Sequence, residues 1–315
     1  ALEALAALAD QVLDPHLFAY FAASNEIWNA RFQGWHWCKA QGRALFGSLG
    51  GLKGNERDTQ IARQFLAWRF YNGFPLMQAH DSHGRFRFIW EDMSTWPGAA
   101  QMAADCPSVH RSGLVMDRDR WLSMLWGFAG NLYAGRDMQD FPEFDIASHT
   151  AMQAALIRSW QKRVGAVEKT RQTVADFGHG HQYLSYECGQ HALPRGPAEI
   201  SPLMKFQYSP EMGEFYEQHM LPDLHRLCYA AAFYSDYGTE GKNGTWAHFD
   251  HIADHTSNPK GVAVRKAARA YAGVTPPPQP IPAPEPPPPE AETPPDRRAA
   301  LFAEIRAGLD ELEAI

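Results

Sequence analysis

A proline-rich segment near the C-terminus limits what this chain can fold into more than any other feature. Twelve of the 23 prolines lie between Pro276 and Pro295, among glutamates and small residues. Proline lacks a backbone N–H and has a fixed φ, so a run of prolines cannot join a helix or a sheet. The sequence therefore predicts three parts: a globular body over 1–273, a linker over 274–295 and a terminal helix over 296–315.

The terminal segment 296–315 has the pattern of an amphipathic helix. Its apolar residues recur at intervals of three and four, which places them on one stripe. Arg297 and Arg298 near the start and Asp310 near the end all oppose the helix dipole. A lone helix of this length is marginal in water, so we expect it to be ordered only where its stripe is buried. The stripe residues are Leu301, Phe302, Ile305, Leu309 and Leu312.

This helix leads to a first hypothesis, that the protein is an interaction component of a larger bacterial assembly. The linker would hold the helix away from the body, where it docks to a partner protein or to a second copy. Two alternatives are that the helix packs back on the body and that the tail is disordered. The chain has neither a P-loop nor a serine-hydrolase motif, which argues against an enzyme.

The body has the composition of a large globular domain. Hydrophobic residues make up 45% of the chain and aromatic residues 12%, which suffices for a sizeable core. Eight acidic and three basic residues lie in 276–315, so most of the net charge of −7 belongs to the tail. The body is therefore nearly neutral, which argues against sequence-independent binding of nucleic acid.

The apolar pattern predicts a mainly helical body with one small β-hairpin, an α+β protein. The apolar run 121–133 predicts a buried helix, and a second, long helix is expected over 142–176. The hairpin is placed at 74–79 and 85–90, because apolar residues alternate along the second segment. A glycine- and proline-rich loop is expected over 178–202, and further helices within 1–29 and at 58–71, 210–236, 245–256 and 259–271.

The four cysteines form no CxxC pair, and their spacing fits neither a zinc ribbon nor a disulfide scaffold. Buried free thiols and a cytoplasmic location are therefore predicted; the alternative is an exported protein with two disulfides. We expect neither a membrane span nor a signal peptide, because no apolar stretch has the required length or flanks. The cysteines are Cys38, Cys106, Cys188 and Cys228.

A group of histidines supports a second hypothesis, a metal-dependent hydrolase. His248, His251 and His255 would share one face of a helix, because they are three and four residues apart. Three imidazoles on one face could bind Zn²⁺ or another transition metal. His179 and His181, in a glycine-rich loop, would complete the site if the two groups met. The alternative is that both groups are structural.

A third hypothesis, a nucleic-acid-associated protein, comes from the predicted helix 259–271. This segment carries four basic residues and no acidic one, so it could contact phosphate, an acidic partner or the chain's own tail. A solvated helix face is the alternative. The basic residues are Lys260, Arg265, Lys266 and Arg269.

Overall fold

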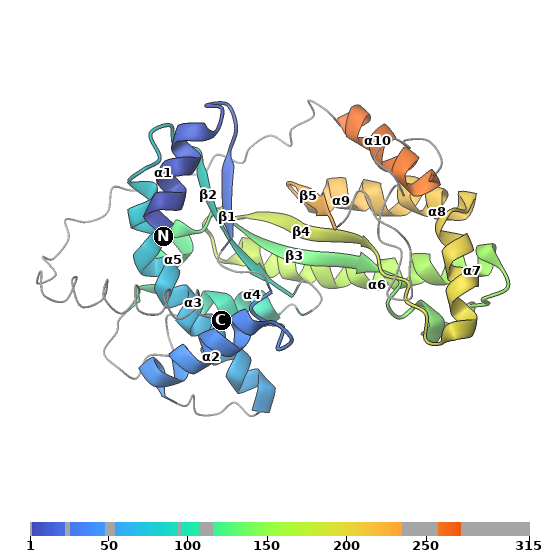
Figure 1. Cartoon of the computed structure of the whole chain (residues 1–315), viewed down its shortest axis with the longest axis horizontal. Helices are drawn as coiled ribbons and strands as arrows, with labels where there is room; N and C mark the ends of the chain where they lie inside the picture. The colour runs from blue at the N-terminus through green and yellow to red at the C-terminus, as the bar shows by residue number, and fades with distance from the viewer. Residues whose placement is uncertain are drawn as a thin grey trace, which may run out of the picture. The chain divides into compact units, whose positions relative to one another are not determined.

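A parallel β-sheet of five strands organises the body of the protein (Figure 1). The strands follow one another across the sheet in chain order, and every neighbouring pair is parallel. They are β1 (Ala19–Ala22), β2 (Phe86–Asp92), β3 (Gly127–Ala134), β4 (Gln182–Gln190) and β5 (Ala231–Phe233). The structure is a computed structural model, and it describes residues 2–22, 26–47, 54–93, 96, 98–106, 116–234 and 258–271.

Helices supply the crossovers that parallel strands require. The described residues all belong to one unit, which spans 1–279. Helix α1 (Leu2–Val12) precedes the sheet and α10 (Pro259–Tyr271) follows it. The helices between strands are α2 (Gln33–Phe46), α3 (Gly54–Gln78), α4 (Gly98–Ala104), α5 (Arg118–Met124), η2 (Met138–Asp140), α6 (His149–Asp176), α7 (Pro197–Gln207), α8 (Pro210–Phe215), η3 (Tyr216–Met220) and α9 (Leu221–Leu227).

This architecture corrects the predicted fold class. The protein has an α/β fold with an all-parallel sheet, and it is not a helical body with a small β-hairpin. The second segment of the predicted hairpin is indeed a strand, β2, but the first lies at the end of α3. Instead of pairing with residues just before it, β2 pairs with β1 and β3, which are distant in the sequence. Local alternation marked the strand correctly and could not identify its partners.

The predicted helix 121–133 is also corrected, because most of it is strand β3. An internal strand of a parallel sheet is buried on both faces, so it is apolar throughout and lacks the alternation of a half-buried strand. Periodicity alone cannot distinguish such a run from a buried helix. Three more strands were missed: β1 within 1–29, β4 within the predicted loop 178–202, and β5 within the predicted helix 210–236. Strand β4 mixes polar and apolar residues, and β1 and β5 have only four and three residues, too few to show a period.

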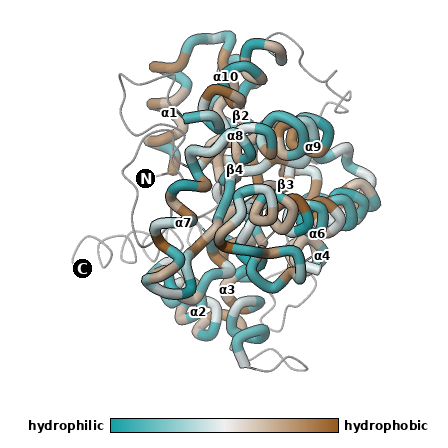
Figure 2. The backbone as a smooth tube through the Cα atoms, turned by 90° about the vertical axis from the view of Figure 1, so that its right-hand side faces the viewer, coloured by the Kyte–Doolittle hydropathy of each residue, from teal (hydrophilic) through white to brown (hydrophobic). Residues whose placement is uncertain are grey.

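Several helix predictions are confirmed. The helix expected within 1–29 is α1, and the segment 58–71 lies within α3. The segment 259–271 is helix α10, and the long helix expected over 142–176 is α6, which begins at His149. Ser148 caps α6, since its hydroxyl accepts a 3.3 Å hydrogen bond from the Ala151 amide. Hydrophilic and hydrophobic residues alternate around α6 (Figure 2), and its buried side chains include Met152, Leu156 and Trp160. This pattern is what an amphipathic helix on a sheet requires.

The two faces of the sheet are packed differently. On one, the helical face, Phe88, Trp90 and Phe128 join a large core with residues of the helices. Figure 1 shows α6 running along β3 and β4 on this side. The second face carries a small cluster of Ile89, Ala129 and Leu184, to which no helix residue of the described segments belongs. Right-handed crossovers between consecutive strands bring the helices to one face, which accounts for the difference.

Several sequence predictions fall outside the described residues. These are the linker 274–295, the terminal helix 296–315 with its apolar stripe, and the helix 245–256.

Within the described segments, no helix combines the length and apolar character needed to cross a membrane. All four cysteines are buried and free of disulfides, as the sequence predicted.

Candidate active site

Three glutamates meet at the carboxyl ends of the strands. Glu91 is the penultimate residue of β2, Glu187 lies in the second half of β4, and Glu26 follows β1. They are close enough for Glu26 and Glu187 both to raise the pKa of Glu91. In open parallel sheets, ligands bind beyond the carboxyl ends of the strands, so this is where a functional site is expected.

The alternation of β2 directs Glu91 to the second face. Phe88 and Trp90 belong to the core of the helical face, whereas Ile89, two residues before Glu91, belongs to the small cluster of the second face. Successive side chains of a strand point to opposite faces, so Glu91 lies on the same side as Ile89. The partner of Glu91 in β3 is Ala129, another member of that cluster.

A β-bulge brings two residues of β4 to the site. Gly130 pairs with Ser185, but the next residue, Asn131, pairs with Glu187, so Tyr186 is the extra residue. Bulges redirect side chains and are common next to active sites. Here the bulge lets Tyr186 and Glu187 both contribute: the Tyr186 hydroxyl donates a 3.3 Å hydrogen bond to Glu26 Oε1, and Glu187 interacts with Tyr133.

Glu26 is buried in an unusual backbone conformation. Its φ of +48° is the only positive value at a non-glycine residue within the described segments. Its Oε2 accepts a 2.8 Å hydrogen bond from Asn29 Nδ2, so donors hold both carboxylate oxygens. A left-handed conformation costs a residue with a side chain on the order of 1 kcal/mol, and such strain is concentrated at functional sites.

Glu91 is a carboxyl group that gains its proton near neutral pH. Burial, together with the charges of the nearby Glu26 and Glu187, raises the pKa of Glu91 to about 7. A carboxylic acid with a pKa near 7 can donate a proton to a leaving group at physiological pH. Burial also raises the pKa of Glu187, with Glu26 contributing, whereas the hydrogen bond from Tyr133 opposes this shift.

Two tyrosines frame the glutamates as hydrogen-bond donors. The Tyr133 hydroxyl donates to Glu187 Oε1, and burial followed by this contact raises the pKa of Tyr133. Burial, and then the charge of Glu26, raises the pKa of Tyr186. Both hydroxyl groups therefore remain protonated at physiological pH. We call Glu26, Glu91 and Glu187, with Tyr133 and Tyr186, the carboxylate site.

Aromatic side chains line the opposite, amino end of the second face. The ring of Trp126 packs edge-on against those of Tyr20 and Tyr229, with centroids 5.4 Å and 4.9 Å apart. Trp126 also contacts the small apolar cluster of this face. The second face is thus apolar at the amino ends of the strands and acidic at their carboxyl ends.

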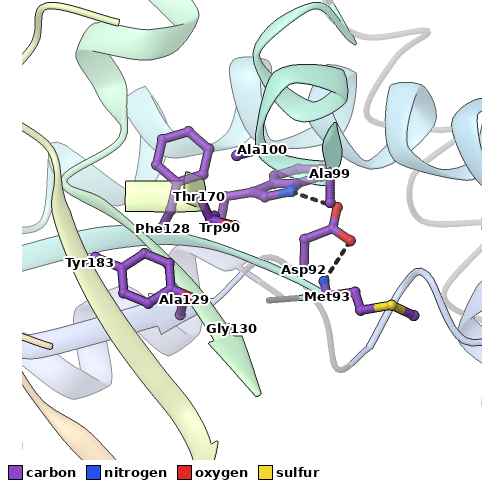
Figure 3. A pocket seen from close by; sticks show the side chains of 10 residues that line it. All are labelled: Trp90, Asp92, Met93, Ala99, Ala100, Phe128, Ala129, Gly130, Thr170 and Tyr183. Atoms are coloured by element: carbon purple, nitrogen blue, oxygen red, sulfur yellow. Dashed lines mark hydrogen bonds between the residues drawn. The ribbon is translucent and has the colours of Figure 1, made fainter. Parts of the chain in front are cut away.

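A buried ion pair on the helical face has a structural role. Arg63 binds Asp92 through two hydrogen bonds of 2.6 Å, and both side chains are almost fully buried. Asp92 also accepts hydrogen bonds from Trp90 Nε1 and the Met93 amide (Figure 3). The adjacent cavity, drawn in Figure 3, has a volume of about 10 Å³ and is near the lower limit for one water molecule. It has no room for a substrate.

The structure places His179 and His181, two of the five predicted histidines, away from the carboxylate site. His179 and His181 lie in the connection from α6 to β4, at the amino ends of the strands. His181 Nε2 is 2.8 Å from the Leu122 carbonyl oxygen, and its ring packs against Phe128. The described segments contain no group of three His, Cys, Asp or Glu residues that could hold a metal ion. His248, His251 and His255 lie outside these segments, so the metal site stays a prediction.

The predicted basic residues of α10 have different environments. Lys260 is 1% exposed, and its Nζ donates a 3.4 Å hydrogen bond to Gln207 Oε1. Lys266 forms an ion pair with Glu217 on η3, and Arg265 is half-buried. Arg269 is exposed. Helix α10 therefore packs on α8 and η3 with part of its basic face, and its nucleic-acid role stays a prediction.

Sequence reasoning missed all three glutamates of the carboxylate site. The available signal was a glutamate directly after an apolar, strand-like run, which holds for Glu91 and Glu187. Glu26 gives no comparable signal, because it lies in a connection after a strand of four residues. Comparison with protein-family models, curated proteins and solved structures finds no match to this chain. The function is therefore inferred from the chemistry of the carboxylate site.

Proposed function

We propose that the protein hydrolyses glycosidic bonds, with Glu91 as the general acid and Glu26 as the second catalytic carboxylate. The observation that carries this proposal is the raised pKa of Glu91 beside a second buried carboxylate held by two donors. When two neighbouring carboxyl groups have environments that differ in this way, one can act as the general acid and the other as the base or nucleophile. A pair of carboxyl groups is the usual machinery for cleaving an acetal.

The roles follow from the contacts of each glutamate. Below a pH of about 7, Glu91 carries the proton that the departing glycosidic oxygen requires. Glu26 accepts hydrogen bonds from Asn29 and Tyr186, which fix the position from which it can attack the anomeric carbon or activate a water molecule. Glu187 raises the pKa of Glu91, and Tyr133 fixes the position of Glu187.

The surroundings of the site also suit a sugar. The rings of Tyr133 and Tyr186, and that of Trp28 near the Tyr186 hydroxyl, offer apolar surface beside polar groups. Aromatic rings that present an apolar face and a polar tip complement saccharides, which have both kinds of surface. All four cysteines are buried, and burial raises the pKa of each thiol. Ser185, next to Tyr186, is also buried, and its hydroxyl donates a 3.1 Å hydrogen bond to the Glu187 carbonyl oxygen.

A panel of aryl glycosides tests the proposal. The wild-type protein should hydrolyse at least one of them, and Glu91→Gln should lower kcat/KM about 10²–10⁴-fold for substrates with poor leaving groups. The loss should be much smaller for dinitrophenyl glycosides, which need no proton on the leaving oxygen. Glu56→Gln, an exposed glutamate of α3, is the matched control. An absence of hydrolysis across the panel, or an equal loss for both leaving groups, would refute the proposal.

The assembly role predicted from residues 296–315 concerns a different part of the chain and stays a separate proposal. It rests on the apolar stripe and the adverse charges of that segment. The cytoplasmic location is likewise a proposal, supported by four buried thiols without a disulfide.

A further inference from the structure

Two arginines and a histidine gather just beyond the carboxylate site. Arg136 follows the end of β3, His191 follows the end of β4, and Arg163 lies on α6. The backbone joins the first two, since the His191 amide donates a 2.5 Å hydrogen bond to the carbonyl oxygen of Ala134. We call Arg136, Arg163 and His191 the cationic cluster.

Tyr133 connects the cationic cluster to the carboxylate site. Its ring packs edge-on against the His191 ring, with centroids 5.0 Å apart, while its hydroxyl donates to Glu187. One side chain thus contacts both groups. A ligand that lies across Tyr133 would have the glutamates at one end and the positive charges at the other.

The nearby acid, Asp137, offsets only part of the charge of the cationic cluster. Asp137 binds Lys162 Nζ at 2.7 Å and the Ser159 hydroxyl at 2.5 Å, so both of its oxygens are occupied. Within the described segments, neither Arg136 nor Arg163 forms an ion pair, and Arg163 Nε is buried without a hydrogen-bond partner. A buried donor without an acceptor is costly, so a bound anion would stabilise this arrangement.

The pKa values of Arg163 and His191 reflect both their burial and the nearby positive charges. Burial lowers the pKa of Arg163, and Arg136 lowers it further, against the opposing charge of Asp137. Burial likewise lowers the pKa of His191 to about 4, with Arg136 and Arg163 contributing. Positive charges that repel one another in this way would be relieved by an anionic ligand.

We propose that the cationic cluster binds an anionic substituent of a saccharide, so that the substrate is an acidic glycan. The inference rests on the proposed glycosidase function, because the cluster adjoins the carboxylate site through Tyr133. A uronate carboxylate and a sulfate ester share the required chemistry, since both accept parallel hydrogen bonds from a guanidinium group.

Calorimetric titration of the full chain carrying Glu91→Gln tests this, because that variant should bind substrate without cleaving it. The probes are oligogalacturonate, sulfated galactan oligosaccharides and neutral galactan oligosaccharides of matched length. We expect at least tenfold tighter binding of one anionic probe than of the neutral one. The better anionic probe then identifies carboxylate or sulfate as the group recognised.

Substitutions then locate the binding. Adding Arg163→Gln or Arg136→Ala should remove the anionic preference and leave the affinity for the neutral probe unchanged, whereas Arg158→Ala, an exposed residue of the same helix, should preserve it. Circular dichroism checks that each variant is folded. Equal binding of anionic and neutral probes, no binding of any probe, or a preference that survives both substitutions would overturn the inference.

The two proposals fail in different ways. If neutral glycosides are hydrolysed with the expected dependence on Glu91 but no anionic preference exists, the glycosidase function stands and the anion site is refuted. If the anionic probe binds through Arg163 but the wild-type protein cleaves no glycoside, the binding site stands and the proposed function is refuted.

Discussion

The hydroxyl of Tyr186 donates a hydrogen bond to Glu26 Oε1, although the two residues are 160 positions apart in the sequence. The contact links β4 to the connection after β1, across two intervening strands. It depends on the bulge that adds Tyr186 to β4 and on the left-handed backbone of Glu26. Two local irregularities are thus combined at one hydrogen bond of the carboxylate site.

Removing this hydroxyl should slow catalysis with little effect on folding. Tyr186→Phe keeps the ring and deletes one hydrogen bond to a carboxylate, so we expect kcat/KM to fall about tenfold. Tyr229→Phe at the amino end of the same face is the control, because it lies far from the glutamates. Steady-state kinetics on an aryl glycoside measures both, and equal activities of the two variants would contradict a role for Tyr186.

The pH dependence of activity should report the proton on Glu91. Activity should fall as the pH rises through about 7, because the ionised form cannot act as an acid. Glu187→Gln removes a negative neighbour and should lower the pKa of Glu91, which moves the basic limb of the pH–rate profile to lower pH. A basic limb that does not move would show that Glu187 leaves the proton on Glu91 unaffected.

The same raised pKa predicts how stability changes with pH. The folded protein binds the Glu91 proton more tightly than the unfolded chain, so ionisation destabilises the fold as the pH rises from about 4.5 to 7. Glu91→Gln should therefore increase the Tm relative to wild type more at pH 8 than at pH 4. Calorimetric scans at the two pH values measure this, with Glu56→Gln expected to show no such difference.

The buried pair of Arg63 and Asp92 should contribute strongly to stability. Asp92→Asn leaves an unpaired guanidinium that is 1% exposed, and we expect a loss of about 3–5 kcal/mol in the free energy of unfolding. Asp105→Asn, which breaks the half-exposed pair with Arg118, should cost less than about 1 kcal/mol. Urea denaturation of the two variants compares them, and similar losses would contradict the importance of burial.

The role predicted for the segment 296–315 can be tested in the full chain. If its apolar stripe docks to a second copy, Ile305→Asp with Leu309→Asp should shift the protein to a smaller oligomer at equal concentration. Ala303→Asp with Ala307→Asp adds the same charge off the stripe and should not. Light scattering during size-exclusion chromatography measures the mass of the protein. An unchanged mass would exclude self-association through the stripe. Docking to a different protein would then be tested by comparing complex formation by the wild-type chain and the variant.

Features that depend on local pattern were predictable from the sequence. Helix α10 has the predicted bounds, and α6 was recognised from the spacing of its apolar residues. The alternation along 85–90 revealed β2, although its pairing was wrong. Strand β3 was taken for a helix because both of its faces are buried, and a uniformly apolar run has no period to read.

The sequence alone determined that a proline-rich segment separates a near-neutral, aromatic-rich part of the chain from an acidic tail, because proline content and charge are properties of the chain itself. Only the tertiary structure decided that Glu26, Glu91 and Glu187 form one site. Their proximity depends on parallel pairing between distant strands and on a one-residue bulge. A shift of one residue in either strand would turn its glutamate to the helical face, and no local pattern specifies such a register.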